Sequence, residues 1–205
     1  MTQADMTAKK NHHHGDLREA LITAGLEIME ESGFEALTLR KCAARAGVSH
    51  AAPAHHFHGI ISLKAAIIAR GHRIFAATMR ARAADALPDP MAQLCAICAG
   101  YLEFSEKHRA LFQLMFQPTP RDLSAITPSV LEELMFEAGG SYGVLRTACE
   151  PFESDKRAPN SVEIAVWSMV HGYAMLFGET ETREAAPTGP IPDFSIILPI
   201  LTLQI

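Results

Sequence analysis

The apolar residues of this chain recur at the spacing of an α-helix in one segment after another. Leu17, Leu21, Ala24 and Ile28 form one such stripe, and the segment 161–179 carries another that ends at Phe177. Residues three or four apart share one face of a helix, so each stripe can pack against a core. No convincing alternating run supports a β-sheet, although 194–205 could pass for one strand. The pattern therefore predicts an all-α fold.

Start and stop residues divide the first third of the chain into short helices. The first is expected from about Asp16, and Gly33 suits the left-handed position that ends it. Thr38 is expected to cap a second helix that Gly47 ends, and Ser49 to cap a third that runs to His55 or His56. A long helix is then expected over 61–84.

The rest of the chain is expected to be helical as well. Asp89 as cap and Pro90 as first residue begin one helix. Further helices are expected over 110–116, from Pro128 with a kink or break at Gly139-Gly140, and over 161–179 with Asn160 and Glu163 as a capping box. The segment 194–205 contains Pro199, so it is either a kinked helix or no helix.

The chain's positive charges are concentrated in one window. Residues 36–84 carry eight Lys/Arg and no Asp or Glu, although the 205 residues have a net charge of −5. The remainder has ten Lys/Arg and 23 Asp/Glu, a net charge of −13. A basic segment in an acidic chain points to a polyanion as partner, with nucleic acid first.

Inside this basic window, residues 37–57 form two short helical segments around Gly47-Val48-Ser49. This is the layout of a helix-turn-helix, in which the second helix enters the DNA major groove. The alternative is a solvated charged face on an ordinary helical hairpin. Because the charge bias and the turn pattern coincide, we favour DNA binding.

Cysteines and histidines suggest no metal or redox site. Cys95 and Cys98 match C-x-x-C but lie in an apolar helical run without a second pair, so buried core thiols are favoured, with Cys42 and Cys149 as the other thiols. His12-His13-His14 is interpreted as a polar N-terminal arm. We expect no metal and no cofactor.

Other classes of protein are disfavoured. No stretch approaches the ~20 apolar residues that cross a bilayer, and Met1–Lys10 lacks the apolar core of a signal peptide. We therefore expect a cytoplasmic protein without a membrane partner. An enzyme is disfavoured because the chain has no phosphate-binding glycine loop, nucleophile elbow or His-Glu-x-x-His helix.

From His13 to about Arg70 the chain resembles the TetR family of bacterial transcriptional regulators. The resemblance rests on His14-Gly-Asp-Leu-Arg18, Gly33-Phe34, Leu37-Thr-Leu-Arg40, Ala46-Gly-Val-Ser49 and His56-Phe57. Trp167-Ser-Met-Val-His-Gly172 is similar to the Trp-x-x-x-His-Gly signature of one C-terminal class in that family.

The resemblance implies a three-helix DNA-binding head over 13–60, with its helix-turn-helix at about 38–57. A long helix would join the head to a larger helical ligand-binding and dimerisation domain over 61–205. It also implies a homodimer that binds a double-stranded DNA operator, with recognition helices ~34 Å apart or a multiple of that. A small-molecule effector would shift the distance between heads and release the operator.

Roles for individual residues follow from the same resemblance. The DNA-contacting set would comprise Thr38, Arg40, Ser49, His50, Ala51, Ala54, His55, His56 and Lys64. The family usually has Tyr at the position of Ala54 and Lys at that of Ile60, and both grip phosphate. Losing them would flatten the salt dependence by about one to two units of slope, which Lys64 would offset. Protonation of the clustered histidines near phosphates would make binding pH-sensitive.

The C-terminal domain of the family holds a pocket, and Met and aromatic side chains suit an adaptable apolar cavity. Any one of them could instead be ordinary core. The candidates are Phe75, Met79, Tyr101, Phe104, Phe112, Met115, Phe116, Met135, Phe136, Trp167, His171 and Tyr173. The segments 161–179 and 194–205 would form the dimer interface.

The sequence thus predicts a DNA-binding regulator, a repressor released by a small apolar ligand. The alternative is a ligand-binding or protein-interaction module with a weakened DNA-binding head, which Ala54 and Ile60 favour. The basic window argues against that alternative.

Overall fold

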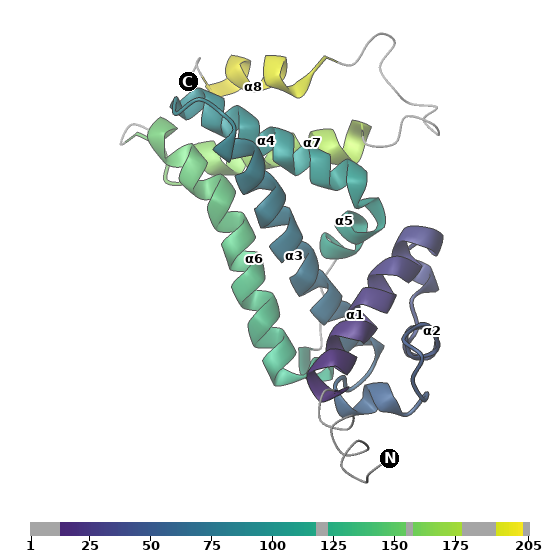
Figure 1. Cartoon of the computed structure of the whole chain (residues 1–205). Helices are drawn as coiled ribbons and strands as arrows, with labels where there is room; N and C mark the ends of the chain where they lie inside the picture. Colours follow the sequence, from purple (N-terminus) through teal and green to yellow (C-terminus); the bar gives the residue numbers. More distant parts are fainter. Residues whose placement is uncertain (1–12, 118–122, 155–157, 178–191, 203–205) are drawn as a thin grey trace, which may run out of the picture. The chain divides into compact units, whose positions relative to one another are not determined.

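The computed structural model describes residues 13–117, 123–154, 158–177 and 192–202, without the side chains of 13–16 and 199–202. The described residues form α-helices and short 3-10 helices and contain no strand (Figure 1). The all-α prediction is confirmed. The elements are α1 (His13–Ser32), η1 (Phe34–Ala36), α2 (Leu39–Arg45), η2 (Ala52–His55), α3 (Ile60–Ala84), α4 (Pro90–Lys107), α5 (Arg109–Met115), η3 (Leu123–Ala125), α6 (Pro128–Cys149), η4 (Glu150–Phe152), α7 (Ser161–Phe177) and α8 (Phe194–Thr202).

These elements form two compact units. Unit 1 comprises Met1–Gly71 and Ala110–Phe136, and unit 2 comprises His72–Arg109 and Glu137–Ile205. The units divide α3 and α6 between them, whereas the sequence placed a domain boundary at residue 60. The first part of α3 belongs to unit 1 because its apolar side chains help to build the core of the head.

In unit 1, α1 packs against α2 and η1, and α2 packs against η2. In the predicted stripe of α1, Leu21, Ala24 and Ile28 are buried and Leu17 is half-buried. Leu21 is fully inaccessible, as are Leu63 and Ile67 of α3. Gly25 lets α1 approach α3 closely, because a Cβ there would lie 2.5 Å from Ile67 Cδ1. The core of unit 1 is therefore shared by α1 and the start of α3.

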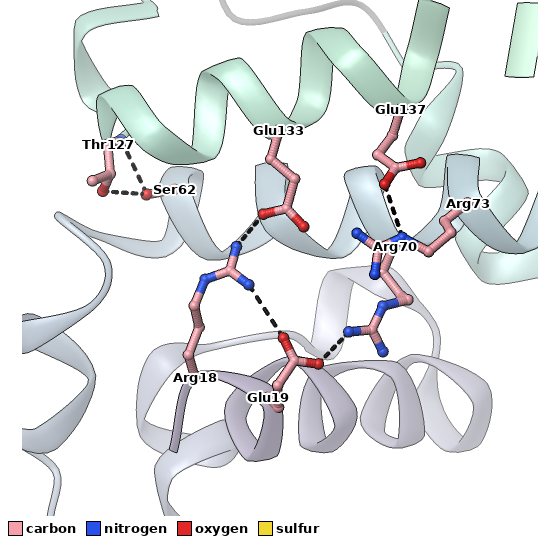
Figure 2. Close-up of polar contacts among 8 residues, drawn as sticks. All are labelled: Arg18, Glu19, Ser62, Arg70, Arg73, Thr127, Glu133 and Glu137. Carbon is pink, nitrogen blue, oxygen red and sulfur yellow. Dashed lines mark hydrogen bonds and ion pairs between the residues drawn. The ribbon is translucent and has the colours of Figure 1, made fainter. Parts of the chain in front are cut away.

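Ion pairs surround that core (Figure 2). Arg18 of α1 is paired with Glu133 of α6 and, at 3.2 Å, with its neighbour Glu19. Glu19 is also paired with Arg70 of α3. Two hydroxyls make a further link, since Ser62 Oγ lies 2.7 Å from Thr127 Oγ1 and accepts the Thr127 N–H at 3.1 Å. Polar contacts thus tie the start of α6 to α1 and α3.

In unit 2, α4 packs against α7, and α8 packs against both (Figure 1). The interior contains the buried side chains of Met79, Leu94, Tyr101, Phe104 and Leu198. Asp89 caps α4 as predicted, because its Oδ2 accepts the Ala92 N–H at 2.9 Å. Among the helices of the described ranges, none combines the length and apolar character that a membrane crossing requires.

Two local expectations are corrected within unit 2. The α6 helix continues through Gly139-Gly140 without a break, because a helix-interior glycine costs only about 1 kcal/mol. The predicted Asn160 cap is wrong: Glu153 Oε1 accepts the N–H groups of Val162 and Glu163, and Asn160 has φ 61°.

For the last segment the sequence left two outcomes open, a kinked helix or no helix. The backbone is helical over Phe194–Thr202, a span that includes Pro199. Residues 203–205 of the predicted segment lie outside the described residues, as do 178–179 of the helix predicted to end there.

Candidate nucleic-acid interface and ligand-binding region

The start of α2 presents the first group of predicted DNA contacts. Thr38 has extended backbone angles and its Oγ1 accepts the Lys41 N–H at 3.2 Å, so the predicted cap is confirmed. Such a cap is worth about 1 kcal/mol. It fixes the first turn of α2, where the side chains of Thr38, Arg40 and Lys41 are exposed.

A glycine turn follows α2 and leads to residues 49–56, which we call the recognition segment. Gly47 adopts φ 69°, in the left-handed region where a side chain would be strained. The Val48 N–H then donates to the Ala43 carbonyl at 3.0 Å. The predicted end of the second helix at Gly47 is confirmed within two residues.

The recognition segment differs from the α-helix expected to begin at Ser49. It consists of a turn and η2, with hydrogen bonds from Ala52 N–H to Ser49 O and from His56 N–H to Pro53 O. An α-helix capped by Ser49 would need a donor at Pro53, which has no N–H. The 3-10 pattern uses Ala52 instead, and no side chain caps η2.

This segment nevertheless exposes the predicted contact residues. Pro53 and Phe57 are buried and hold it against the core. The side chains of Ser49, His50, Ala51, Ala54 and His55 are exposed, and His56 and Lys64 are half-buried.

Half of the cations in the basic window have carboxylate partners outside it. Arg45 makes a two-pronged contact with Glu31 at 2.6 and 2.5 Å, and it also pairs with Glu27. This contact holds the pKa of the Glu31 carboxyl below its usual range. In the same way, Arg70, Arg73 and Arg82 pair with Glu19, Glu137 and Glu103.

The remaining cations of the window are Arg40, Lys41, Lys64 and Arg80, which have no acidic partner among the described residues. The first three belong to unit 1 and lie near the exposed recognition segment in the chain. The window is thus less positive than its composition indicates. The sequence alone does not reveal this, because the acidic residues that pair with these cations lie outside the basic window.

Several predicted pocket residues meet in the interior of unit 2. The Phe75 ring packs edge-on against Tyr101 with centroids 4.7 Å apart and lies 4.9 Å from Phe104. Met79 and these three aromatic residues are buried. Tyr101 Oη lies 2.8 Å from His171 Nδ1 on α7.

The Tyr101–His171 pair is electrically neutral. Burial raises the pKa of Tyr101, against the hydrogen bond of Trp167 to its hydroxyl, and burial lowers the pKa of His171. A neutral imidazole can accept a hydrogen bond from the phenolic O–H at Nδ1. The Trp167-His171 signature therefore contacts α4 through a polar, uncharged cluster.

The other pocket candidates do not join this cluster. Phe112, Met115 and Phe116 belong to unit 1, where the rings of Phe112 and Phe116 lie 4.8 Å apart. Met135 and Phe136 are 67% and 78% exposed on α6. Tyr173 packs against Phe194 of α8 at 5.3 Å. The assignment of a pocket to the candidates stays a prediction.

Sequence reasoning missed a cavity in unit 2 of about 740 Å³. Its lining includes Arg80, Ile97, Gly139, Gly143 and Arg146, and none of the predicted pocket residues. In the sequence, Gly139 and Gly140 were noted only as a possible kink or break of the helix, and Gly143 was not singled out. Their spacing of three and four residues, on one face of a helix, was the available signal.

The cysteines of the described helices are unpaired thiols. Cys42, Cys98 and Cys149 are buried; burial raises the pKa of Cys98, and it raises the pKa of Cys149 to about 12. Such thiols stay protonated and unreactive. The described residues contain no group of three or more His, Cys, Asp or Glu that could hold a metal ion.

Comparisons with known proteins agree with this architecture. Residues 21–67 match the family model of bacterial regulatory proteins of the tetR family, and residues 94–188 match the tetracyclin repressor-like C-terminal domain. The two models cover most of the chain, which belongs to the TetR family of DNA-binding transcriptional regulators. None of the curated proteins matches it.

Solved structures share the fold. A protein of unknown function from Rhodococcus sp. RHA1 is 22% identical, covering 94% of this chain and 95% of its own, with a TM-score of 0.66. The TetR family transcriptional regulator PfmR of Thermus thermophilus is 19% identical over 78% of this chain and 85% of its own, with a TM-score of 0.56. A regulatory protein of the tetR family from Rhodococcus RHA1 is 20% identical over 91% and 93%, with a TM-score of 0.56.

Proposed function

We propose that the protein is a homodimeric repressor that binds a double-stranded DNA operator and leaves it when a small apolar effector binds. The observation that carries the proposal is the exposed surface of unit 1 from Thr38 to His55. It presents Arg40 and Lys41 without carboxylate partners in the described part of the chain, whereas Arg45 on the same helix is fully engaged.

The roles of these side chains follow from their chemistry. Arg40 and Lys41 would contact phosphate, which fixes the head on the duplex. Ala51 and Ala54 can touch a thymine methyl but cannot donate a hydrogen bond. His50 and His55 would add donors to phosphate when protonated. Such a surface would contact few bases, and most of these contacts would be apolar.

The predicted dimer interface is supported by an apolar surface on the last two helices. Ile164, Met175 and Leu176 of α7 and Ile196 of α8 are each at least half exposed. Large exposed apolar surfaces mark interaction sites. A second copy of the chain would cover this surface, and sedimentation of the free protein would then give the mass of a dimer.

The effector would act at the aromatic cluster around Tyr101 in unit 2. It can release the operator only if it binds the DNA-free arrangement more tightly than the DNA-bound one. Because the cluster is apolar and its polar groups are neutral, an effector with few hydrogen-bonding groups suits it.

Fluorescence anisotropy of the protein's own upstream intergenic DNA, against a scrambled duplex, tests the proposal. With three unpaired cations per head, we expect log affinity to fall against log salt with a slope of about −3 per head. Substitution R40Q should reduce that slope by about one unit per head. R82Q is the matched control, because Arg82 is paired with Glu103 in unit 2.

Three outcomes contradict parts of the proposal. Equally weak binding to both duplexes would show that the upstream intergenic DNA contains no operator that the protein recognises specifically. No binding even at low salt would favour the interaction-module alternative. An operator affinity that is constant between pH 6 and 8 would exclude the histidines from phosphate binding.

A further inference from the structure

The cavity of unit 2 lies among the end of α3, the start of α4 and the second half of α6. Its volume of about 740 Å³ falls in the range of small-molecule sites, about 300–1,000 Å³. Every lining residue belongs to unit 2. The aromatic cluster around Tyr101 contributes none of them, so this is a separate site.

Among the described residues, the charged side chains that line the cavity are both positive. They are Arg80 and Arg146, and no described Asp or Glu lines it. Neither arginine has a carboxylate partner in the described parts of the chain, whereas Arg73 and Arg82, on the same helix as Arg80, both do. Two guanidinium groups that pair with no described carboxylate therefore border one cavity.

Three glycines leave part of the α6 side of the cavity as bare backbone. Gly139, Gly140 and Gly143 line it, and a Cβ at any of them would meet no atom within 4 Å. A flat group can therefore lie against the helix without displacing a side chain. Apolar walls are supplied by Ile97 and Val144 and by prolines such as Pro90.

We propose that this cavity binds a small organic anion with a flat apolar body, namely an aromatic carboxylate. The arginines would bind the carboxylate, for which the planar guanidinium is well matched, and the ring would lie on the three glycines. A single negative charge suits a lining that is otherwise mostly apolar, because each further charge must lose its hydration. Any effect of such binding on the operator complex rests on the proposed function.

Calorimetric titration of the full chain with naphthoate tests the site. We expect R80Q and R146Q each to weaken binding by about tenfold or more, the typical effect of losing a charge-assisted hydrogen bond. The matched control R82Q removes a guanidinium two residues along α3 that does not line the cavity, and it should leave the affinity unchanged. Neutral naphthamide should bind weakly and equally to all four proteins.

A second variant tests the glycine surface. G143L places a large side chain in the cavity while improving helix propensity, so helical content by circular dichroism should be kept and naphthoate binding lost. Affinity unchanged in R80Q, R146Q and G143L would overturn the proposal. A change of G143L from dimer to monomer would also overturn it, because a second copy would then occupy the cavity.

A separate measurement keeps this proposal distinct from the proposed function. Naphthoate is added to the complex with upstream DNA after the calorimetry. Binding with the expected variant pattern supports the site whether or not DNA is released. Release from wild type but not from R80Q would join the site to regulation, whereas a protein that binds naphthoate but no DNA would refute the regulator and leave the site intact.

Discussion

Within each unit, glycines allow helices to approach closely, and the two units differ in which atoms meet at these contacts. In unit 1, a Cβ added at Gly25 or Gly71 would meet the ends of flexible side chains, Ile67 Cδ1 at 2.5 Å and Met115 Sδ at 2.6 Å. In unit 2, a Cβ at Gly100 would meet the backbone of α3, with Met79 Cα at 2.7 Å and Thr78 O at 3.0 Å. Side chains can change rotamer and backbone cannot, so the α3–α4 contact at Gly100 should tolerate added volume less well than the contacts at Gly25 and Gly71.

The two units also differ in the charge of the polar groups that make their contacts. The long-range polar contacts around α1 in unit 1 are ion pairs, such as Arg18–Glu133 (Figure 2). Inside unit 2, neutral groups meet: Tyr101 with His171, and His72 with Ser141 at 2.8 Å. Salt weakens the first kind of contact, and acid acts on the second. The ion pairs around α1 and the neutral contacts inside unit 2 should therefore weaken under different conditions.

The largest expected effect sharpens the contrast between the glycines. G100A should lower the free energy of unfolding by about 2–3 kcal/mol, because α3 and α4 must separate to admit the methyl group. G71A should stay within about 1 kcal/mol of wild type, because Met115 can move and alanine favours the helix. Urea unfolding followed by circular dichroism measures both. Equal losses would remove the distinction between side-chain and backbone contacts.

An intermediate effect concerns acid and His72. Burial lowers its pKa to about 4, against the opposing charge of Glu137. Because the pKa in the unfolded chain is about 6.5, between these values only the unfolded chain binds the proton. Stability should therefore be constant above pH 6.5 and fall as the pH drops from 6.5 to 4, by about 2 kcal/mol at pH 5.

The control for this prediction is H72Q, which cannot titrate. The Ser141 hydroxyl donates to the Ala138 carbonyl at 3.0 Å, so His72 Nδ1 is the donor to Ser141, and a glutamine amide can donate in its place. The free energy of unfolding falls between pH 7.5 and pH 5, and this fall should be smaller in H72Q than in wild type. The difference between the two falls should be about 2 kcal/mol. An equal pH dependence in both proteins would exclude His72.

The smallest effect belongs to unit 1. A double-mutant cycle of R18Q and E133Q should give a coupling of about 1 kcal/mol that decreases in 1 M NaCl. The exposed Arg45–Glu31 pair provides a comparison, and its coupling should be smaller. A coupling between Arg18 and Glu133 that does not respond to salt would mean that the contact depends on packing, including the Arg18 guanidinium 6.0 Å above the Phe57 ring.

Local rules predicted those features that local chemistry decides. Thr38 and Asp89 were recognised as caps because the donors they satisfy lie three residues further along the chain. Gly33 and Gly47 were recognised as helix ends, and both have positive φ. The apolar stripes identified the α-helices because their spacing needs no knowledge of the partner surface.

Distant partners decided the features that the sequence analysis missed. The capping box of Asn160 and Glu163 failed because Glu163 is buried against the Tyr142 hydroxyl and Glu153 supplies the cap. The carboxylates that pair with Arg70 and Arg73 come from α1 and α6. Pro53 lies in the first turn of the helix expected from Ser49, and its missing N–H changes the hydrogen-bond pattern of the whole short segment.

The close approach at Gly100 also has a mechanical consequence. Where side chains separate two helices, rotamer changes absorb small displacements, and the second helix need not follow the first. At Gly100 the α4 backbone lies directly on the Thr78–Met79 turn of α3, so no rotamer is free to absorb a shift there. Movement of this turn of α3 is therefore transmitted to α4 as in a rigid joint.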